Sequence, residues 1–74
     1  MPQEIVEVPI AGKITSVSVK AGDKIKEGDT ICLLESMKME NPILAPVDGT
    51  ISEIKVSAEE TVMPGNIIAI ILTM

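Results

Sequence analysis

Apolar and polar residues alternate with a period of two in two separate stretches of the chain. The stretches are residues 16–21 and 53–58, whose apolar members are Val17, Val19 and Ala21 in the first and Ile54, Val56 and Ala58 in the second. Such alternation predicts β-strands with one buried face and one face in water. Because no segment shows a 3.6-residue apolar period long enough for a helix, the pattern predicts an all-β fold.

The chain also contains an internal repeat. Shifting the sequence by 37 residues places residues 9–34 over residues 46–71. Seven of the aligned pairs are identical: Pro9/Pro46, Gly12/Gly49, Ile14/Ile51, Val19/Val56, Ala21/Ala58, Gly28/Gly65 and Ile31/Ile68. Ile14 and Ile51 break the alternation by one residue at the same place, which indicates a shared bend or bulge. We therefore expect two similar halves related by a two-fold axis.

This two-fold relation predicts which segments lie side by side. It places residues 5–8 beside residues 68–72, so that the two ends of the chain lie close together. Turn signals occur at Gly22-Asp23, Gly28-Asp29 and Pro64-Gly65-Asn66. The predicted core consists of Val6, Ile14, Val17, Val19, Ile25, Ile31, Leu33 and their counterparts in the second half. Residues 1–74 are expected to form a single small domain.

Composition narrows the classes of function. The chain of 74 residues has no aromatic side chain, no histidine and no arginine. The usual nucleophile–base pairs and zinc sites are therefore excluded, and no catalytic or metal-binding residue is predicted. The net charge of −5 and the lack of a stacking platform argue against nucleic-acid binding.

The remaining sequence signals concern the location of the chain. The first residues, Met-Pro-Gln-Glu-Ile, do not have the charged and then apolar pattern of a signal peptide, and no apolar run approaches the ~20 residues of a membrane helix. We expect no direct membrane insertion. A single cysteine, Cys32, cannot form an internal disulfide and is predicted to fill space within a sheet. The expected location is the cytoplasm.

Residues 35–45 connect the two halves and are not explained by the repeat. In this connector Lys38 lies between Met37 and Met39, with Glu35 and Glu40 outside them. Local chemistry predicts the turn at Asn41-Pro42, because Met-Lys is a poor pair for a tight turn. A conflict between local chemistry and position is typical of functional sites.

The connector resembles the biotin-attachment motif of biotin carboxyl carrier domains. The resemblance rests on Glu35-Ser36-Met37-Lys38-Met39-Glu40, followed by Pro42, Ala45-Pro46 and Gly49, and it extends from about Val8 to Ile71. Related lipoyl domains usually place Asp before the lysine and Ala after it. The resemblance implies a flattened barrel-sandwich of two four-stranded antiparallel sheets. It also implies that Met37 and Lys38 are the central residues of a tight hairpin, against the Asn41-Pro42 prediction.

The resemblance further implies a non-catalytic carrier. A biotin protein ligase would join biotin covalently to Lys38, with Met37 and Met39 as a recognition surface. The attached biotin would shuttle a carboxyl group between partner active sites of a carboxylase, decarboxylase or transcarboxylase. The implied partners are biotin carboxylase and carboxyltransferase or decarboxylase subunits. Glu35 and Glu40 are interpreted either as solvated strand-end charges or as groups that aid ligase discrimination.

Two other functions remain open at this point. One is a lipoyl carrier that uses the same lysine, and the other is an unmodified β-domain that binds proteins. The chain also departs from the family pattern, because Ser36 stands where Ala or Val is usual and Glu59 stands where Gly is common. Since Gly22 occupies the equivalent position in the first half, we expect the turn at Glu59 to differ from the turn at Gly22.

Overall fold

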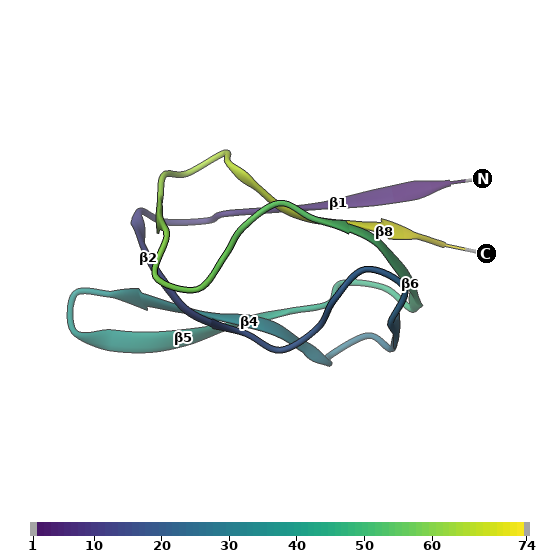
Figure 1. The fold of residues 1–74 in the computed structure, drawn as a ribbon, viewed down its shortest axis with the longest axis horizontal. Helices are drawn as coiled ribbons and strands as arrows, with labels where there is room; N and C mark the ends of the chain where they lie inside the picture. Colours follow the sequence, from purple (N-terminus) through teal and green to yellow (C-terminus); the bar gives the residue numbers. More distant parts are fainter. Residues whose placement is uncertain (1, 74) are drawn as a thin grey trace.

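The computed structural model describes residues 2–73, which form β-strands joined by turns and contain no helix (Figure 1). The strands of these residues are β1 (Gln3–Glu7), β2 (Gly12–Val17), β3 (Lys24–Ile25), β4 (Thr30–Ser36), β5 (Met39–Leu44), β6 (Gly49–Ile54), β7 (Thr61–Val62) and β8 (Ile67–Leu72). The prediction of an all-β chain is confirmed.

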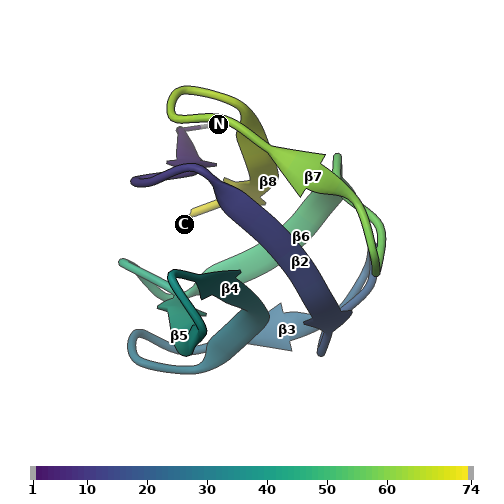
Figure 2. The same ribbon diagram turned by 90° about the vertical axis from the view of Figure 1, so that its left-hand side faces the viewer.

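The strands form two four-stranded sheets with the orders β1-β8-β6-β3 and β5-β4-β2-β7. All strand pairs are antiparallel. Figure 2 shows the strands of both sheets arranged around one interior. Each strand takes the same place in its sheet as the strand four positions away takes in the other sheet. The predicted pseudo-two-fold sandwich is therefore confirmed.

Hydrogen bonds between the halves repeat with the same symmetry. The amide of Gly22 donates to the carbonyl oxygen of Ile51 at 2.8 Å, and the amide of Glu59 donates to that of Ile14 at 2.6 Å. The register of β2 shifts directly after Ile14, and the register of β6 shifts directly after Ile51. These shifts confirm the predicted bulges. Because each sheet contains strands from both halves, neither half forms a complete sheet by itself.

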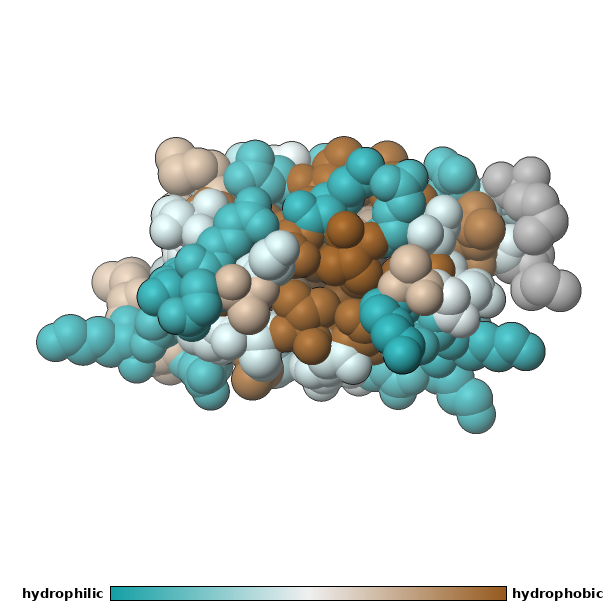
Figure 3. All heavy atoms as spheres, in the orientation of Figure 1, coloured by the Kyte–Doolittle hydropathy of each residue, from teal (hydrophilic) through white to brown (hydrophobic). Residues whose placement is uncertain are grey.

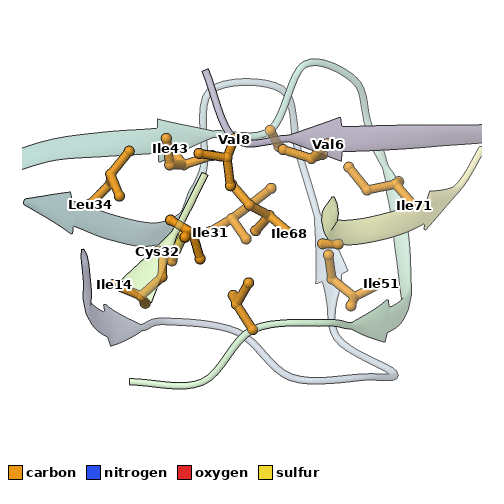
Figure 4. Packing of buried hydrophobic residues seen from close by; sticks show 14 of the residues in the cluster. Val6, Val8, Ile14, Ile31, Cys32, Leu34, Ile43, Ile51, Ile68 and Ile71 are labelled. Atoms are coloured by element: carbon orange, nitrogen blue, oxygen red, sulfur yellow. The ribbon is translucent and has the colours of Figure 1, made fainter. Parts of the chain in front are cut away.

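The buried core is entirely aliphatic apart from one thiol, and side chains from both sheets point into it (Figure 4). It consists of Val6, Val8, Ile14, Ile25, Ile31, Cys32, Leu34, Ile43, Ala45, Ile51, Val56, Val62, Ile68, Ala69 and Ile71. In Figure 3 strongly hydrophobic side chains gather at the middle of the face shown, while polar side chains project at both ends of the long axis. No charged or polar side chain is buried among residues 2–73.

The prediction that Leu33 belongs to this core is wrong. Leu33 is half-buried, whereas its neighbour Leu34 is fully buried. The reason is a register shift between Thr30 and Cys32 in the pairing of β4 with β5. Ile31 and Cys32 are both buried at this irregularity, so the inward-facing set of residues moves by one position.

Val17 and Val19 are less buried than predicted. Both are half-buried and pack against the core from its edge. Strand β2 ends at Val17, so Val19 and the exposed Ala21 lie in the connection to β3. The alternation in residues 16–21 therefore reflects an extended segment that leaves the sheet, and only its beginning is paired.

The expectation that the turn at Glu59 differs from the turn at Gly22 is also wrong. The φ angle is +74° at Glu59 and +96° at Gly22, so both residues occupy the left-handed region. Their amides make the equivalent hydrogen bonds to Ile51 and Ile14 described above. These bonds require the same backbone path in both halves, although a residue with a Cβ is strained there.

The two ends of the described chain lie side by side, as the repeat predicts. Strand β1 pairs with β8 so that Ile5 lies opposite Ile70. The amide of Thr73 donates to the carbonyl oxygen of Pro2 at 3.0 Å. The two ends leave the molecule opposite the β4–β5 hairpin (Figure 1). In the two-fold arrangement, the counterpart of the β4–β5 hairpin is therefore the pair of chain ends on β1 and β8.

Candidate functional site

A two-residue turn joins β4 to β5 and carries Lys38. Met37 has a φ angle of +53° and Lys38 has a φ angle of +66°, while Ser36 and Met39 pair across the turn. Positive φ at both central residues is the requirement of a type I′ hairpin. The prediction from local chemistry that Asn41-Pro42 forms the turn is wrong, and the placement implied by the family resemblance is confirmed.

Pro42 lies within β5, opposite Leu33. Proline lacks the amide hydrogen that another residue in a strand could donate to a neighbouring strand. Since β5 is at the edge of its sheet, one side of the strand has no partner and the missing donor is tolerated there. The proline also limits pairing of this edge with another strand.

The tip of the hairpin projects into solvent. The Met37 side chain is 92% exposed and the Met39 side chain is 65% exposed, and Lys38 between them is exposed as well. The ion pairs in residues 2–73 join Lys13 to Glu59 and Lys55 to Glu53, so the Lys38 ammonium belongs to neither. The structure therefore presents one unpaired amine between two apolar side chains.

Glu35 and Glu40 lie opposite each other in neighbouring strands, just behind the turn, and both are exposed. The hydroxyl of Thr15 lies 3.3 Å from Oε2 of Glu40 and 3.4 Å from the carbonyl oxygen of Leu33, so it can donate to either oxygen. Thr15 was not identified from the sequence. The only signal was the break in alternation beside it, which marks the bulge of β2.

The base of the hairpin is anchored in the body of the molecule. Leu34 and Ile14 pair across β4 and β2 and are both without solvent exposure. Gly12 lies so close to the carbonyl oxygen of Glu35 that an added Cβ would collide with it. The turn is thus held by a packed, close-fitting base, and its tip is free to contact other molecules.

Other candidate features lie away from the hairpin or carry no chemistry. A shallow hollow lined by Lys55, Val56, Glu60, Gly65, Asn66 and Ile67 contains no residue of the hairpin. Within residues 2–73, no cluster of three or more His, Cys, Asp or Glu side chains is placed to hold a metal ion. The same residues also contain no helix long and apolar enough to cross a membrane.

Cys32 is confirmed as a space-filling residue. It lies in β4 with no solvent exposure, and burial raises the pKa of its thiol to about 11. A thiolate is the reactive form of cysteine, and both burial and the raised pKa disfavour it.

A β-sandwich that presents one exposed lysine at the tip of a tight hairpin is suited to carrying a covalently bound group. The chain belongs to the biotin/lipoyl attachment family, because the family described as "Biotin-requiring enzyme" matches residues 4–71. Within that family its class is that of a biotin carboxyl carrier domain, which holds biotin and is not itself catalytic. The lipoyl alternative is not favoured by these comparisons.

Two relatives and one solved structure illustrate the match. The biotinylated protein TB7.3 homolog of Mycobacterium leprae is 44% identical over 68 residues, which cover 92% of this chain and 96% of that protein. The methylmalonyl-CoA decarboxylase subunit gamma of Veillonella parvula is 52% identical over 50 residues, covering 68% of this chain and 39% of that subunit. The chain thus spans nearly all of the first relative and well under half of the second.

The solved structure supports the fold. The crystal structure of the urea carboxylase from Kluyveromyces lactis matches with a TM-score of 0.89 and 24% identity, covering 97% of this chain and 6% of that protein. At this level of identity the match concerns the arrangement of the strands alone. It shows that the sandwich described here also occurs as a small part of a much longer chain.

Proposed function

We propose that Lys38 is the attachment site of biotin and that the β4–β5 hairpin is the surface recognised by the proteins that act on it. The observation that carries this proposal is the position of Lys38 at the tip of a projecting type I′ turn, between Met37 and Met39. An exposed amine without an ion-pair partner fits the formation of an amide with a carboxylic acid. The attached biotin would carry a carboxyl group between two partner active sites.

The residues of the chain divide this work between them. Lys38 provides the amine and carries one of the positive charges counted in the net charge of −5, and the ligase must activate this amine as a nucleophile. Amide formation removes that positive charge, so the net charge of the domain changes from −5 to about −6. The packed base of the hairpin keeps the tip in place, and the long lysine side chain provides the reach that raises effective concentration at partner sites.

The proposed partners are a biotin protein ligase and the biotin carboxylase and carboxyltransferase or decarboxylase subunits of a biotin-dependent system. The similarity to the methylmalonyl-CoA decarboxylase subunit gamma of Veillonella parvula supports a decarboxylase context. Met37 and Met39 supply an apolar contact surface. Because methionine side chains are flexible, this surface can fit different partners. Glu35 and Glu40 lie beside this surface and favour partners with a basic rim. We propose the cytoplasm as the location, which the reduced, buried Cys32 supports.

Co-expression with a biotin ligase and free biotin, followed by intact-protein mass measurement and peptide mapping, tests the proposal. We expect one biotinyl group on Lys38 and none on the other lysines. Lys38→Arg should abolish the adduct while changing the free energy of unfolding by less than about 0.5 kcal/mol, as is usual for an exposed residue. Lys26→Arg, at an exposed lysine of the β3–β4 turn, is the matched control and should keep the adduct.

Three results would contradict the proposal. One is a folded, unmodified protein after co-expression, which would favour a β-domain that only binds other proteins. Another is a lipoyl adduct in place of the biotinyl adduct when a host with both ligases is supplied with both acids. The third is retention of the biotinyl group in the Lys38→Arg variant, which would place the attachment on another lysine.

A further inference from the structure

The methionines of the described chain are all exposed, and two of them flank the proposed attachment site. The exposed fractions are 92% for Met37, 65% for Met39 and 60% for Met63, which lies in the β7–β8 turn. A solvent-exposed thioether is open to oxidation by a hydroperoxide, which converts a flexible apolar side chain into a polar sulfoxide. The surface beside Lys38 can therefore change its polarity without any change in sequence.

The single thiol does not compete for the oxidant. Cys32 has no solvent exposure and packs within the core, away from any exposed surface. The raised pKa of its thiol further lowers the fraction of reactive thiolate. Within residues 2–73 a hydroperoxide therefore reaches the thioethers first.

Oxidation at the hairpin would leave the fold intact. Met37 and Met39 are not members of the buried core, and the hairpin is anchored by Leu34 and Ile14 behind the turn. The polar oxygen of a sulfoxide would remain in water in the free domain. It becomes unfavourable only when a partner covers it with an apolar surface, where an unpaired polar group costs free energy.

We propose that Met37 and Met39 form an oxidation-sensitive recognition surface, and that their conversion to sulfoxides by a hydroperoxide slows the attachment of biotin to Lys38. This inference rests on the proposed function of Lys38 and adds regulation of the same site.

The chemistry is balanced and reversible. The thioether sulfur attacks the peroxide, an S–O bond forms as the O–O bond breaks, and hydrogen peroxide is reduced to water as the sulfur loses two electrons. Methionine sulfoxide reductases, one for each epimer at sulfur, reverse the step. In that reaction two thiols form a disulfide, the sulfoxide returns to the thioether and one water is released.

The test compares the unmodified carrier before and after mild treatment with hydrogen peroxide. Peptide mass mapping measures oxidation at each methionine, and initial rates with a purified biotin ligase, ATP and biotin give kcat/KM for the carrier. We expect kcat/KM to fall about tenfold or more when Met37 and Met39 are oxidised, mainly through a higher KM, because an apolar contact is lost. Treatment with both sulfoxide reductases should restore the rate, and the thermal unfolding curve should not change.

Leucine variants separate the hairpin from the rest of the molecule. Met37→Leu with Met39→Leu removes both thioethers of the hairpin, so the rate of modification that this double variant retains, whatever its size, should no longer respond to peroxide. Met63→Leu should respond like the unchanged protein. If the ligase does not accept the double variant, the test rests on the unchanged chain, whose rate of modification should fall on oxidation and recover after treatment with the reductases.

The outcomes distinguish the two proposals. An unchanged rate after complete oxidation of Met37 and Met39 overturns this inference alone, and so does sensitivity to peroxide that disappears in Met63→Leu. A carrier that is not biotinylated even before oxidation overturns the proposed function, and this inference falls with it.

Discussion

Cys32 shows how the environment of one buried side chain affects the whole domain. The thiol has no solvent exposure, and burial raises its pKa to about 11 because the thiolate would lose its hydration. Its counterpart in the repeat is Ala69, which is equally buried. The position therefore requires a small apolar side chain and does not require sulfur.

The raised pKa predicts that the domain loses stability in alkali. In the unfolded chain the thiol ionises near its ordinary pKa of 9.0, while in the folded chain it remains protonated up to about pH 11. The contribution of the thiol is thus fully present below about pH 9 and is lost as the pH rises to about 11. We expect a loss of roughly 2–3 kcal/mol in the free energy of unfolding over this interval.

Urea unfolding of the unchanged protein and of Cys32→Ala, at several pH values between 7 and 11, measures this loss. The alanine variant retains every other ionisable group of the chain. The difference between the two proteins therefore isolates the thiol, and it should shrink as the pH rises. A difference that does not vary with pH would show that the folded thiol ionises at its ordinary pKa.

The β4–β5 hairpin shows which part of the site local chemistry cannot predict. Rules for tight turns favour Asn41-Pro42 and disfavour Met37-Lys38, because side chains with a Cβ are strained at positive φ. The structure accepts this strain at both central residues, and Leu34 and Ile14 bind the hairpin to the core behind them. Sequence reasoning found the residues of the hairpin through the family motif and missed Thr15, whose contact depends on a bulge.

The strain at the turn predicts that the hairpin can be stabilised at the expense of its function. Replacement of Met37-Lys38 by Asn-Gly, the pair preferred in type I′ turns, should raise the free energy of unfolding by about 1 kcal/mol. The same change removes the proposed attachment amine and the adjacent thioether, so biotinylation should be lost. Thermal unfolding and mass measurement after co-expression with a ligase check both effects.

A matched change in the connection between β6 and β7 serves as the control. Glu59 also occupies the left-handed region, and Glu59→Gly restores the residue type that its counterpart Gly22 has. This variant should keep full biotinylation. If the Asn-Gly hairpin is no more stable than the natural one, then the contacts of the two replaced side chains, and not the φ angles, govern the stability of this turn.

The internal repeat determined how much of the whole fold could be predicted. A period of 37 residues was sufficient for the two-fold relation of the halves, the bulges after Ile14 and Ile51, and the adjacent ends of the chain. The arrangement in two four-stranded sheets was implied by the family resemblance. It could not indicate which face of β4 points inward, because the irregularity near Thr30 moves the inward-facing set from Leu33 to Leu34. Alternation is a local property, whereas the register of a strand is decided by its partners.

The two halves also differ in packing where their sequences agree. Val56 is 6% exposed, and its identical counterpart Val19 is only half-buried. Val56→Ala should therefore lower the free energy of unfolding by roughly 2 kcal/mol, and Val19→Ala by about half as much. Chemical denaturation of both variants measures the difference. Equal losses would mean that the half-buried valine packs as closely as the buried one.

The closeness of the chain ends predicts that the order of the halves can be changed. A shift of 37 residues relates Ser36 and Met39, which flank the two-residue turn, to Thr73 and Pro2, which are hydrogen-bonded at 3.0 Å. An Asn-Gly link in place of residues 74 and 1 should therefore close the second hairpin. New ends between Pro46 and Val47 interrupt no hydrogen bond of residues 2–73 described here, because the neighbouring Ala45 keeps both of its bonds.

We expect this circular permutant to fold and to be biotinylated on Lys38 at a rate close to that of the natural chain. The free energy of unfolding should fall by no more than about 2 kcal/mol, since one short loop is closed and another is opened. Denaturation and ligase kinetics measure the two quantities. A permutant that folds and is not modified would show that recognition extends to the original chain ends, far from the hairpin. An unfolded permutant would show that the order of the halves, and not only their contacts, is needed to form the sandwich.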